Sequence, residues 1–259
     1  MINNNNPIGL FDSGIGGTSI WRAIHQLMPN ENTIYLADSK NAPYGEKSKE
    51  EIIALSKKNT ELLLENNCKI IVVACNTATT NAIKELRASY DVPFIGIEPA
   101  IKPAATHSKT QTIGILATKG TLSSALFNQT VALYQETNII EQIGYGLVEL
   151  IENGEINSTK MEELLQSYLN PMIEKNIDYL VLGCSHYPYL IPKIKKILPQ
   201  NIQIIDSGEA VAKQTLAVLQ SQNGLTNLEK GKCEFYSNVD PKVLNDILEN
   251  NFRATKRDF

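Results

Sequence analysis

The sequence contains no apolar run close to the roughly 18–20 residues that a membrane-spanning helix needs. It also lacks an excess of charge of one sign, since 24 basic and 28 acidic residues give a net charge of −4. Nucleic-acid binding requires a concentrated basic face, and the sequence shows none. We therefore expect neither a membrane nor a nucleic acid as a partner.

Cysteine is scarce and scattered. The chain has four cysteines and no C-x-x-C pair. Such thiols form no disulfide framework and lack the close ligand spacing of a zinc site, so we expect no metal. No signal peptide is recognisable, and we expect a cytoplasmic protein whose thiols stay reduced.

The composition is that of a soluble globular protein, with 42% hydrophobic and 20% charged residues. Strand-like apolar runs are predicted at Ile8–Phe11, Thr33–Ala37, Ile70–Ala74, Phe94–Ile97, Thr112–Leu116, Ile139–Gln142, Tyr179–Leu182 and Gln203–Ile205. Helices are predicted between them at Thr18–Leu27, Lys49–Glu65, Thr79–Ala88, Leu122–Tyr134, Met161–Lys175, Tyr189–Lys196 and Gly208–Leu219. Alternation of this kind indicates crossover units on mainly parallel sheets, so the predicted fold class is α/β.

The two halves of the chain have a similar layout. In Ile8–Gly14 and again in Ile113–Gly120, a strand leads into a turn that opens a helix. This favours a weak internal duplication, although two generic α/β units could share the pattern. Prolines interrupt the chain near Ile97–Pro103 and suggest a boundary there. We expect two similar three-layer α/β domains related by a pseudo-twofold axis, 1–97 with 208–259 and 98–207, with the active site in the cleft between them.

Two of the cysteines end short apolar runs that have the length and β-branched character of buried parallel strands. Asn76 and Thr77 follow Cys75, and His186 stands two residues after Cys184. In open α/β sheets, ligands bind at the C-terminal ends of the strands. The pattern therefore predicts a site served by two thiols, one from each half of the chain.

A cysteine at the end of a buried strand is more often a small core residue than a functional one. Burying the hydroxyl, amide and imidazole groups beside these two thiols in a core would cost free energy, so they favour the functional interpretation. Cys68 and Cys233 have no such neighbours and are interpreted as structural.

The first glycine-rich loop, Asp12–Gly17, resembles part of a dinucleotide-binding fingerprint, and Asp38 follows the next strand where a ribose ligand is expected. The fingerprint fails at its third glycine, which is Ser19 here. The loop still offers N–H groups at the start of a helix, and these suit a carboxylate as well as a phosphate. A tight turn capped by Asp12 remains the alternative.

Five motifs resemble, in the same order, those of the glutamate racemase family, a group of bacterial cell-wall enzymes. They are Phe11–Gly17, Pro43–Gly45, Ala74–Thr79, Gly96–Ala100 and Gly183–Pro188. The resemblance runs from about residue 7 to about residue 215. It implies interconversion of L- and D-glutamate without pyridoxal phosphate, metal or nucleotide, in order to supply D-glutamate for peptidoglycan.

The resemblance also implies which residues carry the chemistry. Racemisation removes the α-proton from one face of the substrate and returns a proton to the other face, with one thiolate as base and one thiol as acid. By resemblance, Cys75 serves one face with help from Asp12, and Cys184 serves the other with help from His186. Glu152 matches a family acidic residue near the second half-site, with an exposed helix-end carboxylate as the alternative. The substrate ammonium, helix N-termini and neighbouring hydrogen bonds are expected to favour thiolate formation.

Further matches imply contacts with the substrate. The positions concerned are Asp12, Ser13, Tyr44, Gly45, Asn76, Thr77, Thr118, Thr121, Ser185 and His186. Their N–H and hydroxyl groups would hold the two carboxylates and the ammonium of glutamate. Ser185 replaces the threonine that is usual in the family, which keeps the hydroxyl and puts substrate affinity in doubt.

Three alternatives remain at this point. A racemase of the same superfamily could act on aspartate or a hydantoin, and a non-catalytic amino-acid-binding module could use the same cleft. A zinc site from Cys75, Cys184 and His186 lacks the usual ligand spacing. Family members are commonly dimeric, so a homodimer is also expected.

Overall fold

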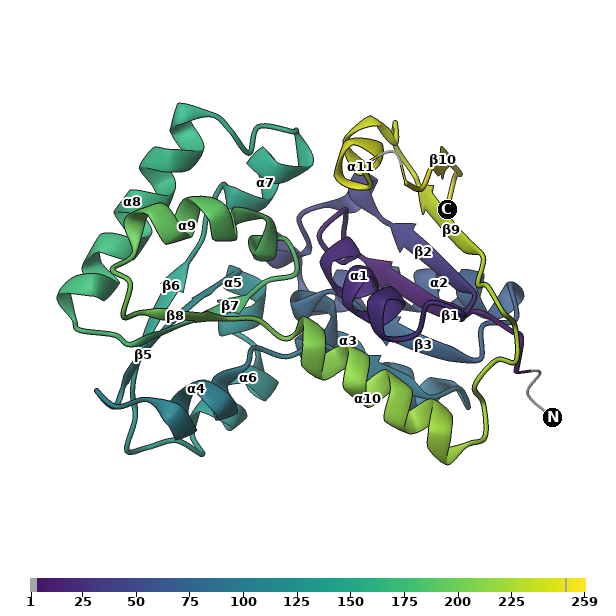
Figure 1. Ribbon diagram of the computed structural model, residues 1–259, viewed down its shortest axis with the longest axis horizontal. Helices are drawn as coiled ribbons and strands as arrows, with labels where there is room; N and C mark the ends of the chain where they lie inside the picture. Colours follow the sequence, from purple (N-terminus) through teal and green to yellow (C-terminus); the bar gives the residue numbers. More distant parts are fainter. Residues whose placement is uncertain (1–3, 250) are drawn as a thin grey trace.

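The computed structural model describes residues 4–249 and 251–259. It consists of two lobes, each built on one sheet (Figure 1). The 6-stranded sheet has the order β10 (Ala254–Lys256), β9 (Cys233–Ser237), β2 (Thr33–Ala37), β1 (Ile8–Asp12), β3 (Ile70–Val73), β4 (Phe94–Gly96). The 4-stranded sheet has the order β6 (Asn138–Ile143), β5 (Thr112–Ala117), β7 (Tyr179–Gly183), β8 (Gln203–Ile205). All of these strand pairs are parallel, which confirms the predicted fold class.

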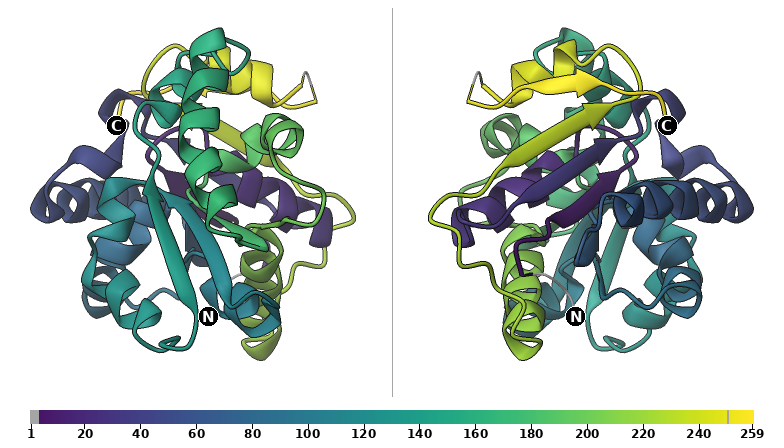
Figure 2. Two further views of the ribbon diagram at one scale, coloured as in Figure 1. Left: turned by 90° about the vertical axis from the view of Figure 1, so that its left-hand side faces the viewer. Right: turned by 90° about the vertical axis from the view of Figure 1, so that its right-hand side faces the viewer.

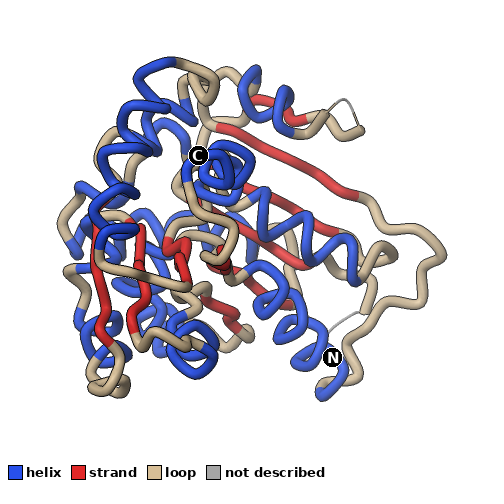
Figure 3. Tube along the Cα trace, turned by 60° about the vertical axis from the view of Figure 1, so that its left-hand side comes forward, coloured by secondary structure: helices blue, strands red, loops and turns tan. Residues whose placement is uncertain are grey.

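Helices cover both faces of each sheet, as Figure 3 shows with strands in red and helices in blue. In the first lobe the covering helices are α1 (Thr18–Leu27) and α10 (Gly208–Ser221) on one face, and α2 (Lys49–Glu65) and α3 (Asn76–Ser89) on the other. In the second lobe they are α8 (Thr159–Glu174) and α9 (Ile191–Ile197) on one face, and α4 (Ile101–His107), α5 (Lys119–Leu122) and α6 (Ala125–Val131) on the other. The remaining helices are α7 (Leu147–Glu152), α11 (Lys242–Ile247) and the 3₁₀ turns η1 (Ser39–Asn41), η2 (Tyr44–Glu46) and η3 (Tyr187–Leu190).

Strand β3 explains why the sequence before Cys75 is apolar throughout. Successive side chains of a strand point to opposite faces of its sheet. Ile70 and Val72 pack in the core on the α1 side, whereas Ile71 and Val73 pack in the core on the α2 and α3 side. Both faces are covered, so no position in the strand can be polar without a partner.

The chain returns to the first lobe after β8. Helix α10 packs against α1, and β9 then pairs with β2 and carries β10 at the sheet edge (Figure 2). The strands of the larger sheet thus fall within 1–97 and 208–259, and those of the smaller sheet within 98–207. On this basis we propose the division 1–97 plus 208–259 and 98–207.

Several predicted elements differ in extent. The single helix expected over Leu122–Tyr134 is wrong: α5 ends at Leu122 and α6 begins at Ala125, because the Ser124 hydroxyl accepts the N–H of Phe127 and starts a new helix. The proline-punctuated stretch after Ile97 holds α4, which tolerates Pro103 in its first turn because an N–H is not needed there. Strands β9 and β10 were not predicted. Within the described part of the chain, no helix has the length and apolarity to cross a bilayer.

Candidate active site

Cys75 and Cys184 occupy equivalent places in the two lobes, each at the C-terminal end of a central strand. Cys75 follows β3 and caps α3, and its sulfur accepts the N–H of Ala78 at 3.4 Å. It also donates to the Ser13 hydroxyl at 3.7 Å. Cys184 follows β7 directly, and its sulfur lies 3.8 Å from Nδ1 of His186. Both thiols are buried.

The two thiols belong to one buried polar cluster that crosses the lobes. The Ser185 hydroxyl, next to Cys184, donates to Oδ1 of Asp12 at 3.2 Å. Asp12 ends β1, beside Ser13, which contacts Cys75. A charge on Cys184 adds to the effects that raise the pKa of Cys75.

Burial raises the pKa of the Cys75 thiol well above its usual value, and the charge of Asp12 raises it further. The Ala78 N–H and the Ser13 hydroxyl act in the opposite direction but do not compensate. The expectation that the helix N-terminus favours the thiolate is therefore outweighed in the free protein. Burial and the charge of Asp12 thus favour the neutral thiol at Cys75.

His186 is completely enclosed and touches three acidic or thiol groups. Its Nε2 lies 2.6 Å from Oε1 of Glu152, and its Nδ1 lies 4.0 Å from Oδ2 of Asp12. Burial lowers the pKa of His186, but hydrogen bonds with Cys184 and Glu152 and the charges of Asp12 and Glu152 outweigh it. The net pKa lies well above its usual value, which favours the protonated ring, and the N–H of Gly16 also points at Nε2 at 3.3 Å.

Asp12 is fixed by donors on both oxygens. The N–H of Gly17 donates to Oδ2 at 2.8 Å, and Ser185 donates to Oδ1. Burial raises the pKa of Asp12, while His186, Gly17 and a hydrogen bond from Cys75 lower it without cancelling the effect of burial. Asp12 is thus held within the thiol cluster.

Glu152 ends α7 in the second lobe and reaches the first lobe. Its Oε1 accepts the N–H of Ile15 at 2.7 Å, and its Oε2 accepts the Ser39 hydroxyl at 2.8 Å. Its side chain is 12% exposed, so it is not the exposed helix-end carboxylate of the alternative interpretation. The glycine-rich loop therefore holds a carboxylate, as its N–H groups allow, and the protein itself supplies it.

Three threonine hydroxyls meet where the lobes touch. Oγ1 of Thr77 lies 2.8 Å from Oγ1 of Thr118 and 3.4 Å from Oγ1 of Thr121, and Thr118 donates to Thr121 at 3.0 Å. Gly45 approaches so closely that a Cβ there would lie 2.9 Å from the Thr118 Cβ. The structure brings these four predicted residues together.

Asn76 is a predicted site residue whose buried amide has no hydrogen-bond partner. It is the first residue of α3 and is 2% exposed, yet neither its amide nitrogen nor its amide oxygen has a partner. Buried amides are costly to leave unsatisfied and are usually paired in folded proteins. Its amide is therefore available to a ligand at the end of β3.

The Tyr44 hydroxyl has its hydrogen-bond partners within the protein. It donates to Asp38 and accepts from Asn59 at 3.2 Å, and the side chain is fully enclosed. Asp38 also binds Asn41 at 2.8 Å and Asn238, so it serves this network and not a ribose. Sequence reasoning missed Asn59, Asn238 and Ser39, which meet their partners only through the fold.

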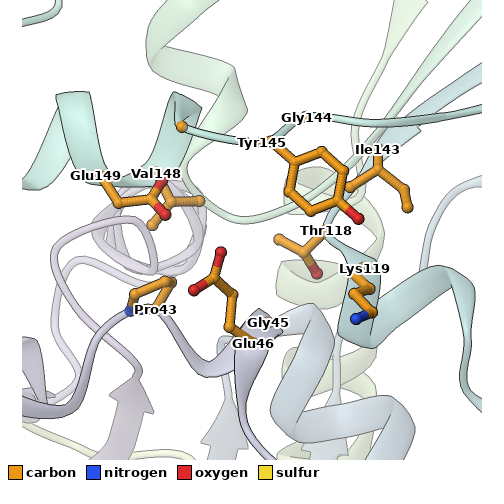
Figure 4. Close-up of a pocket in the computed structure, with 11 residues that line it drawn as sticks. Pro43, Gly45, Glu46, Thr118, Lys119, Ile143, Gly144, Tyr145, Val148 and Glu149 are labelled. Carbon is orange, nitrogen blue, oxygen red and sulfur yellow. The ribbon is translucent and has the colours of Figure 1, made fainter.

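A cleft opens between the lobes next to the threonine cluster (Figure 4). It is lined by Pro43, Gly45 and Glu46 from the first lobe, and by Thr118, Lys119 and residues 143–146, 148 and 149 from the second. The carboxylates of Glu46 and Glu149 point into it. No group of three or more potential metal ligands occurs among residues 4–249 and 251–259.

Comparison with known proteins agrees with this arrangement. A family model described as Asp/Glu/Hydantoin racemase matches residues 9–215. A glutamate racemase from Herpetosiphon aurantiacus is 42% identical over 237 residues, covering 91% of this chain and 93% of that protein. One from Pseudomonas putida is 40% identical over 250 residues, covering 96% and 94%.

Solved structures give the same result. A glutamate racemase from Bacillus anthracis superposes with a TM-score of 0.89 at 28% identity, covering 99% of this chain and 98% of that one. An Escherichia coli glutamate racemase in complex with L-glutamate and the activator UDP-MurNAc-Ala gives 0.86 at 31% identity and covers 97% of both chains. The chain therefore belongs to the Asp/Glu/hydantoin racemase family and is an amino-acid racemase.

Proposed function

We propose that the protein is a cofactor-independent glutamate racemase in which Cys75 and Cys184 transfer protons on opposite faces of the substrate. The observation that carries the proposal is the pair of buried thiols, one from each lobe, joined through Asp12 and Ser185 in one polar cluster. Relatives at 40–42% identity over almost the whole chain are glutamate racemases, which supports glutamate as the substrate.

In each turnover one sulfur is a thiolate and the other a thiol. The thiolate takes the α-hydrogen as a proton, so that an S–H bond forms and the C–H electron pair stays on the α-carbon and its carboxylate. The opposite thiol then gives its proton to the other face, which restores a C–H bond and leaves a thiolate. The reverse reaction uses the same two groups with exchanged roles.

In this scheme a different neighbouring side chain assists each thiol. Asp12 lies close enough to Cys75 for each to shift the pKa of the other, and we assign it as the acceptor of the Cys75 proton. His186 places an imidazolium N–H beside Cys184 and supplies positive charge there when the sulfur is a thiolate. The substrate ammonium offsets the burial that keeps Cys75 neutral, so thiolate formation accompanies substrate binding.

Substrate recognition uses fixed neutral groups, which donate to the carboxylates through N–H and O–H and accept from the ammonium through oxygen. We assign the Asn76 amide, the Ser13 and Ser185 hydroxyls and the hydroxyls of Thr77, Thr118 and Thr121 to the two carboxylates and the ammonium. Such preorganised donors also stabilise the charge that develops when the α-proton leaves. Tyr44 acts through its backbone and by placing Gly45, because its hydroxyl is engaged with Asp38.

The wider role follows from the relatives. A glutamate racemase supplies D-glutamate for peptidoglycan, and we propose this role here. A homodimer and a cytoplasmic location stay predictions. Aspartate is the alternative substrate, because the matching family model is described as Asp/Glu/Hydantoin racemase.

The test is incubation of the purified protein with L-glutamate in heavy water, without added cofactor. Deuterium at the α-carbon together with loss of optical rotation is expected. Turnover of aspartate but not of glutamate would favour the alternative substrate. Binding of glutamate without any exchange would favour a non-catalytic binding module.

A further inference from the structure

Ser39 is a half-buried residue outside the predicted site whose hydroxyl binds a member of it. It opens η1 in the first lobe, directly after Asp38, and donates to Oε2 of Glu152 at 2.8 Å. Glu152 belongs to the second lobe, so this hydrogen bond joins the lobes. Neither the sequence motifs nor the proposed chemistry accounts for it.

The two oxygens of Glu152 have different partners. Oε1 accepts the N–H of Ile15 at 2.7 Å and contacts Nε2 of His186 at 2.6 Å, and Oε2 has the Ser39 hydroxyl. A carboxylate held at one oxygen can rotate about its terminal bond, whereas one held at both cannot. Ser39 therefore fixes the plane of the carboxylate that orients His186.

Ser39 is itself held rigidly on both sides. The carboxylate of Asp38 accepts hydrogen bonds from Tyr44, Asn41 and Asn238. The N–H of Lys40 donates to Oδ1 of Asn238 at 2.9 Å. The N–H of Asp38 donates to the Asp12 carbonyl at 3.0 Å, which ties this turn to the end of β1. The hydrogen bonds of both neighbouring residues thus fix the turn that carries the Ser39 hydroxyl.

We propose that Ser39 is a positioning residue for the Cys184 half of the reaction, acting through Glu152 and His186. The inference rests on the proposed function. With Glu152 fixed at both oxygens, the His186 ring is held at Nε2 at 2.6 Å, and its Nδ1 lies 3.8 Å from the Cys184 sulfur. Ser39 and Ile15 come from one lobe and Glu152 and His186 from the other, so the relay is complete only when the lobes are together.

The experiment is a double-mutant cycle on the full-length enzyme with glutamate, measuring kcat and KM in both directions. The variants are Ser39→Ala, Ser39→Thr, Glu152→Gln and Ser39→Ala with Glu152→Gln. Ser221→Ala is the matched control, because it removes an exposed hydroxyl of α10 that bonds only its own helix. Thermal unfolding of every variant is followed by circular dichroism.

Loss of the Ser39 hydroxyl is expected to lower kcat about tenfold, with KM changed less than about twofold, because positioning affects the transition state more than the ground state. Ser39→Thr keeps the hydroxyl and should restore most of the loss. In the Glu152→Gln background, Ser39→Ala should cost less than about twofold, because residues of one network are not additive. The control should match the wild type.

Two kinds of result would overturn the inference. A fully active Ser39→Ala variant, or an equal loss in both Glu152 backgrounds, would show that Ser39 does not act through Glu152 while leaving the proposed function standing. A wild-type protein that does not racemise glutamate would remove the proposed function and this inference with it.

Discussion

Nε2 of His186 lies 2.6 Å from Oε1 of Glu152, and this contact joins a ring that faces Cys184 to a carboxylate that also holds the first lobe. The charge on the ring depends on its neighbours. The facing titratable groups are Asp12 from β1, Glu152 from α7 and Cys184 from β7, and together they outweigh burial and raise the pKa of His186.

Glu152→Gln is expected to move the alkaline limb of the pH profile. The imidazolium is present below the pKa of His186 and is lost as the pH rises through it. Removing the Glu152 charge lowers that pKa, so activity should decline at a lower pH than in the wild type. The measurement is kcat/KM against pH, with Glu162→Gln, a surface carboxylate paired with Lys193, as the control. An unmoved limb would contradict an imidazolium role for His186.

Removal of either cluster thiol should abolish racemisation. Each sulfur is the only proton carrier assigned to its face of the substrate, so Cys75→Ala and Cys184→Ala should each lower kcat by at least about a thousandfold. Polarimetry with either enantiomer measures this. Cys233→Ala is the matched thiol control and should keep wild-type activity. Cys233 lies in β9 and contacts His25 of α1, and neither residue belongs to the thiol cluster. Full activity in either single cluster variant would refute the two-thiol mechanism.

Asn76→Ala should separate binding from stability. The Asn76 amide has no partner within the protein, so its loss removes no hydrogen bond from the fold. KM for glutamate should rise about ten- to a hundredfold, the cost of one hydrogen bond to a charged group, with little change in Tm. Asn59→Ala is the contrasting variant, because Asn59 is buried and bonded to Tyr44, and it should lower Tm. A fall in Tm for Asn76→Ala with unchanged KM would exclude Asn76 as a ligand.

Gly120→Ala should hinder the approach of the lobes. A Cβ at this position would lie 2.8 Å from Cγ2 of Thr77 and 3.1 Å from the Gly45 backbone, across the threonine cluster. We expect kcat/KM to fall more than about tenfold, since a small misplacement of binding groups is costly to catalysis. Gly224→Ala is the control, because its nearest contact would be at 3.5 Å. Equal activity of the two variants would argue against tight contact at this junction.

Lys69→Ala should reduce stability without involving the site. Lys69 and Glu31 form a buried ion pair at 2.6 Å, with side chains 1% and 2% exposed. Removing one partner leaves a buried charge unpaired, which costs about 3–5 kcal/mol of unfolding free energy. Urea unfolding measures this. Lys57→Ala breaks a partly exposed pair with Glu85 and should cost less than about 1 kcal/mol, so similar losses would contradict the argument.

Much of the fold can be predicted from the sequence where a local pattern reflects burial. Strands such as Thr33–Ala37 and helices such as Lys49–Glu65 have the predicted bounds, because their apolar spacing matches the faces that they cover. Strands β9 and β10 lie toward the sheet edge and are only partly buried, so no continuous apolar run marks them. Strand β9 joins the sheet by pairing with β2 and β10 by pairing with β9, which no local pattern encodes.

The candidate site likewise contains residues that a local pattern predicts and residues that only the fold brings together. Cys75 and Cys184 stand out because a thiol and polar neighbours follow an apolar strand. Ser39 and Asn238 do not, because each is an ordinary loop residue until the fold brings it to Glu152 or to Asp38. The hydroxyl of Tyr44 has its partners for the same reason, since they are residues of other elements.

The pairing of β9 with β2 has a consequence for biosynthesis. Residues 98–207 form a continuous stretch whose sheet can close as soon as β8 has left the ribosome, whereas β2 keeps an open edge until translation reaches β9. An open strand edge invites association with other chains. The nascent first lobe thus depends on a segment made after the whole second lobe to cover the edge of β2, so mutations or truncations in β9 should show themselves first as aggregation during expression.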